Sequence, residues 1–214
     1  TYPEDRLLAT FPGSMRELRA DEVPDALLSR GKHLHVASFF LQSALQPGLA
    51  PLFARAKALG LTTSLDTGWD PAEAWTSAAL GAVFPHLDVF LPNEAELAAL
   101  SGKADSDEGA AWALARGVRL LALKRGRDGS TLSQRNAAPL RQSAFPVAVV
   151  DTTGAGDSFD AGFLYGFLKG WGLERSLELA AACGALAASA LGGTGGFASL
   201  DEVRRFVRSE ERSS

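Results

Sequence analysis

The chain has 214 residues, of which 46% are hydrophobic and 21% charged, and its formal net charge is −4. This composition is typical of a soluble globular protein with one sizeable core. It contains no Lys- or Arg-rich run and no apolar stretch of about 18 residues, so nucleic acid is a poor candidate partner and a membrane span is not expected. The single cysteine, Cys183, excludes an internal disulfide and indicates a reducing, cytoplasmic environment.

Short apolar runs alternate with helical periodicity about every 25–30 residues, which is the spacing of βα units. In chain order, strands are predicted over residues 34–37, 61–65, 87–91 and 118–123. Helices are predicted over 49–59, near 72–80, from Asn93 through Leu100, and over 107–116. Residues 131–132 and 145–150 are expected to form a short antiparallel excursion, followed by a helix after residue 156, an Ala-rich helix from about Glu174 and a last helix over 200–207. The alternation predicts an α/β fold with helices on both faces of a mostly parallel sheet, and no linker divides the chain, so one domain over 1–214 is expected.

The beginning of the chain is polar and lacks an initiator Met, so residues 1–5 do not have the pattern of a secretory signal. Either the start has been removed or the chain is a piece of a longer protein. Residues 6–11 have the pattern of an isolated strand for which the chain offers no obvious partner.

Residues 151–159, DTTGAGDSF, join a strand-like run to a helix. Such a loop exposes the first N–H groups of the helix, which carry partial positive charge and bind anions such as phosphate. Gly154, Ala155 and Gly156 leave room for an anion to approach the main chain. Asp157 would stay ionised in the first turn and could take a proton from a hydroxyl that attacks the phosphate. The alternative is that these residues only form a turn and cap a helix.

The run at 151–159 closely resembles the second signature of the ribokinase-like (PfkB) carbohydrate kinases. The resemblance implies a Rossmann-like three-layer αβα sandwich and transfer of the γ-phosphoryl group of ATP to a sugar hydroxyl. Asp157 would be the general base, and the N–H groups of Gly154, Ala155 and Gly156 would stabilise charge on the transferring phosphoryl group. A kinase of a nucleoside or a vitamin alcohol on the same fold, and a non-catalytic nucleotide-binding fragment, are the alternatives.

Asn93 and Glu96 follow a predicted strand with the spacing of a helix capping box. The resemblance adds a second role, because the family has an Asn-x-x-Glu motif at this place whose Glu helps to hold Mg²⁺ and its waters near the phosphates. Glu96 is the matching residue, with Asn93 beside it, and a water-retaining cation held by few carboxylates suits Mg²⁺. Both roles can hold together.

The segment LLALKRGRDGS at 120–130 places Lys124 at a strand end and Gly126 and Gly129 in the loop that follows. By itself it indicates a basic, glycine-containing turn. The resemblance implies nucleotide contacts here, which makes these three residues candidates for the ATP site. The chain has no GxxxxGK[ST] motif, which argues against a P-loop NTPase.

The segment LGGTGG at 191–196 is expected to end the Ala-rich helix. In the family this region lines the adenine pocket, so Gly192 and, in the preceding helix, Cys183 are candidate nucleotide contacts. Together with Asp151 and Thr153 the loop would border a monovalent cation site, which adds K⁺ to the expected ATP and Mg²⁺.

Four further polar residues lie near predicted strands. Asp66 follows the strand over 61–65 and is expected to line the site, whereas Asp70 is expected to start a helix. His33 and His35 flank a strand start, and no chemistry is assigned to them.

The resemblance extends over nearly the whole chain but over only the C-terminal two-thirds of the family's length. The part without a counterpart supplies several strands, most of the lid and the sugar-binding Gly-Gly motif, and residues 1–12 resemble a remnant of a lid strand. The parent protein is expected to be a homodimer that acts on a small-molecule sugar, which the sequence does not name. The chain alone is expected to bind nucleotide weakly and not to phosphorylate sugar.

Overall fold

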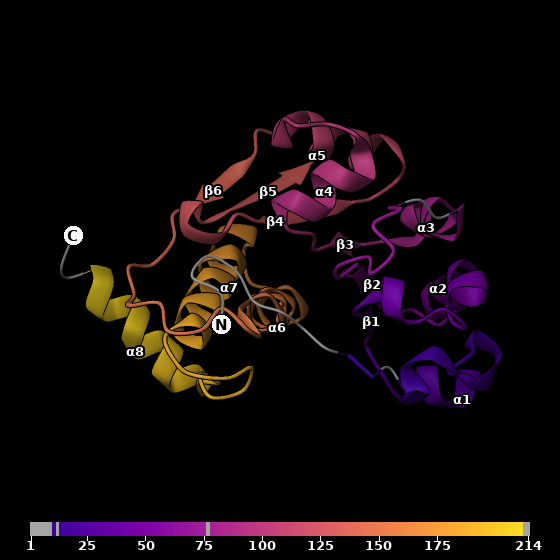
Figure 1. The fold of residues 1–214 in the computed structure, drawn as a ribbon, viewed down its shortest axis with the longest axis horizontal. Helices are drawn as coiled ribbons and strands as arrows, with labels where there is room; N and C mark the ends of the chain where they lie inside the picture. The colour runs from indigo at the N-terminus through magenta and orange to yellow at the C-terminus, as the bar shows by residue number, and fades with distance from the viewer. Residues whose placement is uncertain (1–9, 12, 76–77, 212–214) are drawn as a thin grey trace.

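The computed structural model describes residues 10–11, 13–75 and 78–211, and its centre is one six-stranded sheet (Figure 1). The strands are β1 (His33–Val36), β2 (Thr62–Leu65), β3 (Val89–Phe90), β4 (Leu120–Lys124), β5 (Ser130–Gln134) and β6 (Leu140–Gln142). They lie in the order of the sequence, with β1 to β4 parallel and β5 and β6 antiparallel. The predicted α/β fold with a mostly parallel sheet is confirmed.

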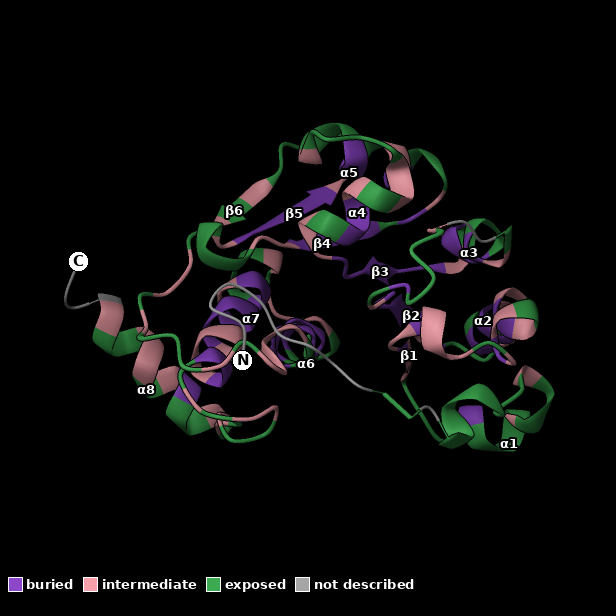
Figure 2. Cartoon of the chain, in the orientation of Figure 1, coloured by how far each residue is buried: buried purple, intermediate pink, exposed green. Residues whose placement is uncertain are grey.

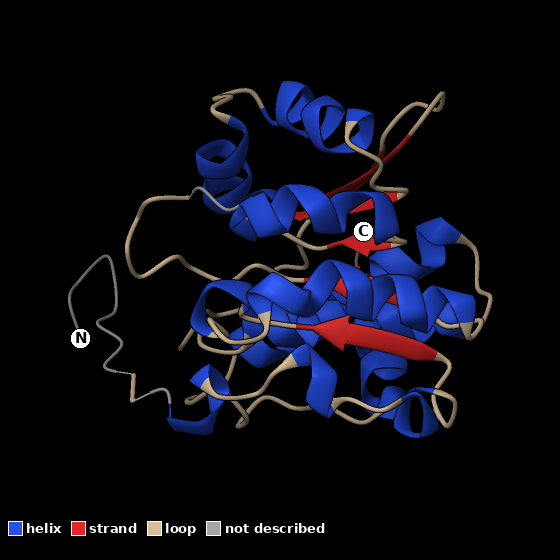
Figure 3. Cartoon of the chain, turned by 90° about the vertical axis from the view of Figure 1, so that its right-hand side faces the viewer, coloured by secondary structure: helices blue, strands red, loops and turns tan. Residues whose placement is uncertain are grey.

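Helices cover both faces of this sheet, so the molecule has three layers (Figures 1 and 3). The helices are α1 (Asp25–Leu28), α2 (Leu49–Ala58), α3 (Ala78–Val83), α4 (Glu94–Ser101), α5 (Ser106–Ala115), α6 (Ala155–Leu168), α7 (Leu173–Ala188) and α8 (Leu200–Glu211). Helices α2 to α5 share one core with the sheet, α6 and α7 share a second, and α8 packs on the outside of α7. Right-handed crossovers between successive parallel strands put α2 to α5 on one face.

The central strands are buried on both sides, as the purple segments of β3 to β5 show (Figure 2). Phe90 and Leu121 belong to the core under α2 to α5, whereas Val89 and Ala122 belong to the core under α6 and α7. Burial on both faces explains why these strands read as continuous apolar runs rather than as alternating ones.

Helices α6 and α7 approach each other closely. A Cβ atom at Gly162 would lie 2.9 Å from the Cα atom of Ala180, so a larger residue would push the two helices apart. This contact fixes the long axis of α6, whose first turn carries the DTTGAGDSF signature.

The helix predicted near 72–80 is misplaced, since α3 is Ala78–Val83 and residues 71–75 are not helical. Asp70 explains the difference. Its carboxylate accepts the N–H groups of Ala72, Ala74 and Trp75 at 2.8–3.0 Å. These bonds close a compact loop instead of capping a helix, and Trp75 has a φ of +51° that a helix does not allow.

The predicted strand over 145–150 is also wrong, because the antiparallel excursion is made by β5 and β6. Pro146 lacks an N–H group for a strand ladder. Phe145, Val147 and Val149 do alternate with period two, but they line a cavity beside α7 instead of a sheet.

The other predicted elements are present, with ends that differ by one to a few residues. The strand proposed over residues 6–11 lies mostly outside the described residues; Thr10 and Phe11 have no regular structure. Among the described helices, none combines the length and apolar character needed to cross a lipid bilayer.

Candidate functional site

Several chain segments end side by side at the carboxyl edge of the parallel strands. Asp66 follows β2, Asn93 follows β3 and pairs in an isolated bridge with Lys124, which is the last residue of β4. The first turn of α6 lies against the same point, since a Cβ atom at Gly156 would be 3.6 Å from Lys124 Nζ. The structure therefore brings these four residues to the edge where open α/β sheets bind ligands.

The turn into α6 requires glycine at its N-cap. Gly154 has a φ of +76°, in the left-handed region. A Cβ atom there would lie 2.3 Å from the carbonyl oxygen of Gly193, so two glycine-containing loops pass each other in direct contact. The signature turn and the loop after α7 thus form one local structure.

Asp157 lies in the first turn of α6 and is exposed. The N–H group of Ala155 donates to the carbonyl oxygen of Thr152 at 3.2 Å, so it is not available to an anion, contrary to the expectation. The tight turn that leads into the helix explains this. Within the described residues, the N–H groups of Gly154, Gly156 and Asp157 have no main-chain acceptor, as is usual at the start of a helix.

Asp151, Thr153 and Gly192, predicted to share a monovalent cation site, do meet. Asp151 Oδ1 accepts the N–H group of Thr153 at 2.9 Å, and Oδ2 accepts the N–H group of Gly192 at 3.0 Å. The Asp151 carboxylate therefore ties the loop after α7 to the signature turn.

Asn93 and Glu96 form the predicted capping box of α4. Asn93 Oδ1 accepts the N–H group of Glu96 at 2.8 Å, and Glu96 Oε2 accepts the N–H group of Asn93 at 2.9 Å. Burial raises the pKa of Glu96, and the negative charge of Asp66 raises it further. The second carboxylate oxygen, Oε1, takes no part in the capping box.

Lys124 lies between two buried carboxyl groups. Its Nζ donates to Asp66 Oδ2 at 2.8 Å and to Asp160 Oδ1 at 3.1 Å. The side chains are 12%, 11% and 4% exposed, respectively. Asp66 also accepts the N–H group of Gly68 at 2.8 Å, so this triad of Lys124, Asp66 and Asp160 connects β4, the loop after β2 and α6.

The charges of the triad largely cancel. Burial alone would lower the pKa of Lys124, but the charges of Asp160 and Asp66 outweigh it and raise that pKa. Burial would raise the pKa of Asp66, but the charge of Lys124 together with the hydrogen bonds to Asp160, Lys124 and Gly68 outweighs it and lowers the pKa. For Asp160, burial dominates and raises the pKa well above its usual range. One ammonium thus faces one firmly ionised carboxylate and a second carboxyl group that is hard to ionise.

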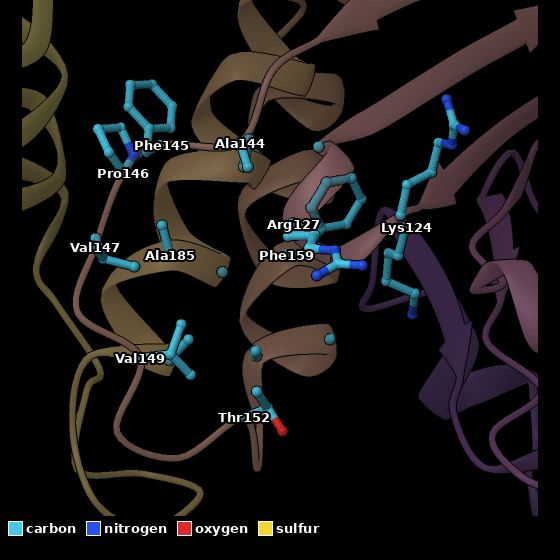
Figure 4. Close-up of a pocket in the computed structure, with 18 residues that line it drawn as sticks. Lys124, Arg127, Ala144, Phe145, Pro146, Val147, Val149, Thr152, Phe159 and Ala185 are labelled. Carbon is cyan, nitrogen blue, oxygen red and sulfur yellow. The ribbon is translucent and has the colours of Figure 1, made fainter. Parts of the chain in front are cut away.

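A cavity of about 560 Å³ opens beside the first turns of α6 (Figure 4). At one end it is lined by the apolar side chains of Phe145, Val147, Val149 and Ala185, and Phe159 of α6 lies between the two ends. The other end is formed by cationic side chains and the signature turn: Lys124, Arg125, Arg127, Thr152, Ala155 and Gly156. An apolar wall joined to a cationic end suits a molecule that carries a flat base and a phosphate group.

Three of the predicted nucleotide contacts, Lys124, Gly126 and Gly129, line this cavity, whereas Cys183 and Gly192 do not. A Cβ atom at Gly162 would lie 3.0 Å from Cys183 Sγ, so the thiol faces α6. Burial raises the pKa of Cys183 to about 11. The residues of α7 that line the cavity instead are small, such as Ala181 and Gly184.

Sequence reasoning missed Asp160 and Arg127. Asp160 lies three residues after Asp157 among apolar residues of α6, and a lone acidic residue on a buried helical face was a signal that could have found it. Arg127 lies between Gly126 and Gly129 in a turn that was itself singled out. The apolar wall over 145–149 was found as a pattern but assigned to a strand.

The chain matches the family model described as pfkB family carbohydrate kinase over residues 1–198. It is 34% identical over 169 residues to the ATP-dependent ribose-1-phosphate kinase of Halopiger xanaduensis, covering 78% of this chain and 52% of that protein. It is 40% identical over 106 residues to the ribokinase of Arabidopsis thaliana, covering 47% of this chain and 28% of that protein.

Solved structures show the same similarity. An E. coli protein provisionally named ribokinase II, in complex with ATP and Mg²⁺, superposes with a TM-score of 0.81 at 27% identity, covering 90% of this chain and 64% of that one. The ribokinase of Thermotoga maritima superposes with a TM-score of 0.77 at 26% identity, covering 92% and 64%. The chain spans about half the length of the first of the curated relatives above and less of the other. On the family match over residues 1–198, this chain belongs to the pfkB family of carbohydrate kinases.

Proposed function

We propose that the chain forms the nucleotide side of an ATP-dependent kinase that phosphorylates a sugar hydroxyl, with Asp157 as general base. The observation that carries this proposal is the position of Asp157. It stands exposed in the first turn of α6, and in the part of the chain that the structure describes it lies beside N–H groups without a main-chain acceptor and next to a cavity without an acidic lining residue.

The two ends of the cavity divide the recognition of ATP. The apolar end, with Phe145, Val147 and Val149, would hold the adenine ring, and the small residues of α7 leave room for it. The N–H groups of Gly154 and Gly156, together with that of Asp157, would stabilise the negative charge of the phosphoryl group as it is transferred.

The chemical step follows from the position of the carboxylate. Asp157 takes the proton of the acceptor hydroxyl as the hydroxyl oxygen forms a bond to the γ-phosphorus atom. The bond between that phosphorus and the bridging oxygen breaks, and ADP leaves with the electron pair. Holding the hydroxyl in line with the phosphate would supply most of the acceleration.

Mg²⁺ fits the residues at Asn93 and Glu96. Glu96 is buried and keeps Oε1 outside the capping box, which suits a carboxylate that holds a water-retaining cation. When bound, the cation would neutralise charge on the ATP phosphates. Asp151 and Thr153 would border a K⁺ site, a proposal supported by their contact with the loop that contains Gly192.

The test is phosphoryl transfer by the longest form of the protein that contains these 214 residues. ADP release would be followed with pentoses, hexoses, ribose 1-phosphate, nucleosides and pyridoxal-type vitamins as acceptors. A sugar acceptor is expected; turnover of a nucleoside or vitamin alone would support the alternative acceptors. ATP binding without any turnover would support a non-catalytic fragment, in line with the match to only 52% of the length of the ribose-1-phosphate kinase.

The role of Asp157 is tested by Asp157→Asn, which is expected to lower kcat about 10²–10⁴-fold with little change in ATP affinity. Asp128→Asn is the matched control, because Asp128 is also an exposed carboxylate near the cavity but lies outside α6. A normal kcat for Asp157→Asn would remove this residue from the mechanism. The homodimer and the cytoplasmic location stay predictions, the first of which size-exclusion chromatography can check.

A further inference from the structure

Three cationic side chains line the cavity beside α6: Lys124, Arg125 and Arg127. They come from the end of β4 and the 3-10 turn Gly126–Asp128 that follows it. Among the described residues, no Asp or Glu lines the cavity. A cationic side chain can bind an anion in the cavity only if it is not already paired with a carboxylate of the protein, so each of the three must be considered in turn.

Lys124 is committed to the protein. Its Nζ lies between Asp66 and Asp160, and all three side chains are nearly buried. If Lys124 moved to bind an anion, the Asp66 carboxylate would stay buried without its counter-ion. The free-energy cost of this unpaired charge would exceed the gain from one phosphate contact. Lys124 therefore contributes little to binding an anion in the cavity.

Arg125 is also paired. Its Nε donates to Glu94 Oε1 at 2.8 Å, and the two side chains are 26% and 38% exposed. The Glu94 hydrogen bond and charge raise the pKa of Arg125. Its charge is thus matched by a carboxylate at the start of α4, on the other side of the turn.

Arg127 differs from both neighbours. Within the described residues its guanidinium forms neither an ion pair nor a side-chain hydrogen bond, and the residue is exposed. Figure 4 shows its side chain extending into the cavity beside Phe159, whereas Lys124 points away toward the sheet edge. Gly126, with a φ of +54°, turns the chain so that the next residue can project in this way.

We propose that Arg127 is the side chain that binds the phosphate chain of the nucleotide, a role for which the family resemblance makes Lys124 the candidate. This inference rests on the proposed function. A guanidinium offers a planar set of donors that matches two phosphate oxygens at once, and its charge never titrates in the physiological range. Thr152 and Gly156 of the signature turn line the same cavity.

The experiment compares ADP with adenosine, measured by isothermal titration calorimetry on the longest form of the protein that contains this chain. Arg127→Gln is expected to raise the Kd for ADP about 10–100-fold, because the variant loses the charged hydrogen bonds between the guanidinium and the phosphates. The Kd for adenosine should stay within about twofold, because adenosine has no phosphate. Arg127→Lys should lie between the wild type and Arg127→Gln. Arg141→Gln is the matched control, because Arg141 is an exposed arginine on β6 that does not line this cavity, and it should change the Kd for ADP less than about threefold.

The possible results separate the two proposals. If the wild type binds ADP and Arg127→Gln binds it equally well, Arg127 is not the phosphate ligand, while the proposed function stands. If Arg127→Gln weakens adenosine as much as ADP, the residue shapes the cavity and the inference is overturned. If the wild type binds neither ADP nor ATP, the proposed function fails, and this inference fails with it.

Discussion

Replacing Lys124 by Met removes the charge of the buried triad but keeps most of the aliphatic stem. The ammonium lies 2.8 Å from Asp66 and 3.1 Å from Asp160, and neither carboxyl group has much access to water. Breaking a buried pair by removing one partner costs about 3–5 kcal/mol, because the remaining charge is left unpaired. With a urea m-value of about 2 kcal/mol/M, the unfolding midpoint should fall by about 1.5–2.5 M.

The loss should also depend on pH. In the wild type the pKa of Asp66 is lowered, so its contribution to the free energy of unfolding is full above the unfolded pKa and is lost as the pH falls through the folded one. Without Lys124 the charge that most lowers the pKa of Asp66 is lost, so this pKa rises and the buried, ionised carboxylate becomes costly. The deficit of Lys124→Met should therefore be larger at pH 8 than at pH 5. Adding Asp66→Asn should recover part of it.

Lys57→Met is the matched control for urea unfolding followed by circular dichroism. It also removes a lysine from a buried carboxylate, since Lys57 Nζ lies 2.9 Å from Asp88. Asp88, however, keeps the N–H group of Thr63 at 2.9 Å and Arg119 at 3.7 Å. A half-exposed lysine of this kind should cost no more than about 1 kcal/mol. Equal midpoints for the two variants would refute the buried, charge-paired role of Lys124.

Three further outcomes are expected. Gly154→Ala should lower the free energy of unfolding by about 2 kcal/mol or more, because alanine is strained at a positive φ and its Cβ atom would clash with the carbonyl oxygen of Gly193. Gly156→Ala should change it by less than about 1 kcal/mol. Equal urea midpoints for the two variants would contradict the tight turn. Burial lowers the pKa of His33 to about 4, so its contribution to the free energy of unfolding should be complete above about pH 6.5 and should be lost as the pH falls toward 4. The free energy of unfolding of His33→Gln should therefore fall less between pH 7.5 and pH 5 than that of the wild type. An identical fall would argue against His33 as the source. If Asp151 and Thr153 border a cation site, initial rates of phosphorylation should be higher in K⁺ than in a large organic cation, and equal rates would count against that site.

The sequence by itself determined the order of the elements and the edge at which the site lies. Apolar runs bounded by polar residues set β2, β3 and β4, and the residues that end these strands had to meet at one edge because parallel strands share a direction. The capping box of Asn93 and Glu96 and the left-handed turn at Gly154 are local, since they involve neighbours in the chain. Such features can be predicted because their hydrogen bonds and φ angles depend on only a few consecutive residues.

Only the tertiary structure decided which side chains share a charge. Lys124 meets Asp66 and Asp160 from 58 and 36 residues away, and nothing in the local pattern around Lys124 distinguishes it from the neighbouring Arg127. Likewise, residues 145–149 alternate like a strand but line a cavity, because α7 rather than another strand lies beside them. Periodicity encodes which face of an element is apolar, but it does not encode which distant segment covers that face. The partner of each charge, and therefore the cation left free to bind phosphate, depends on that packing.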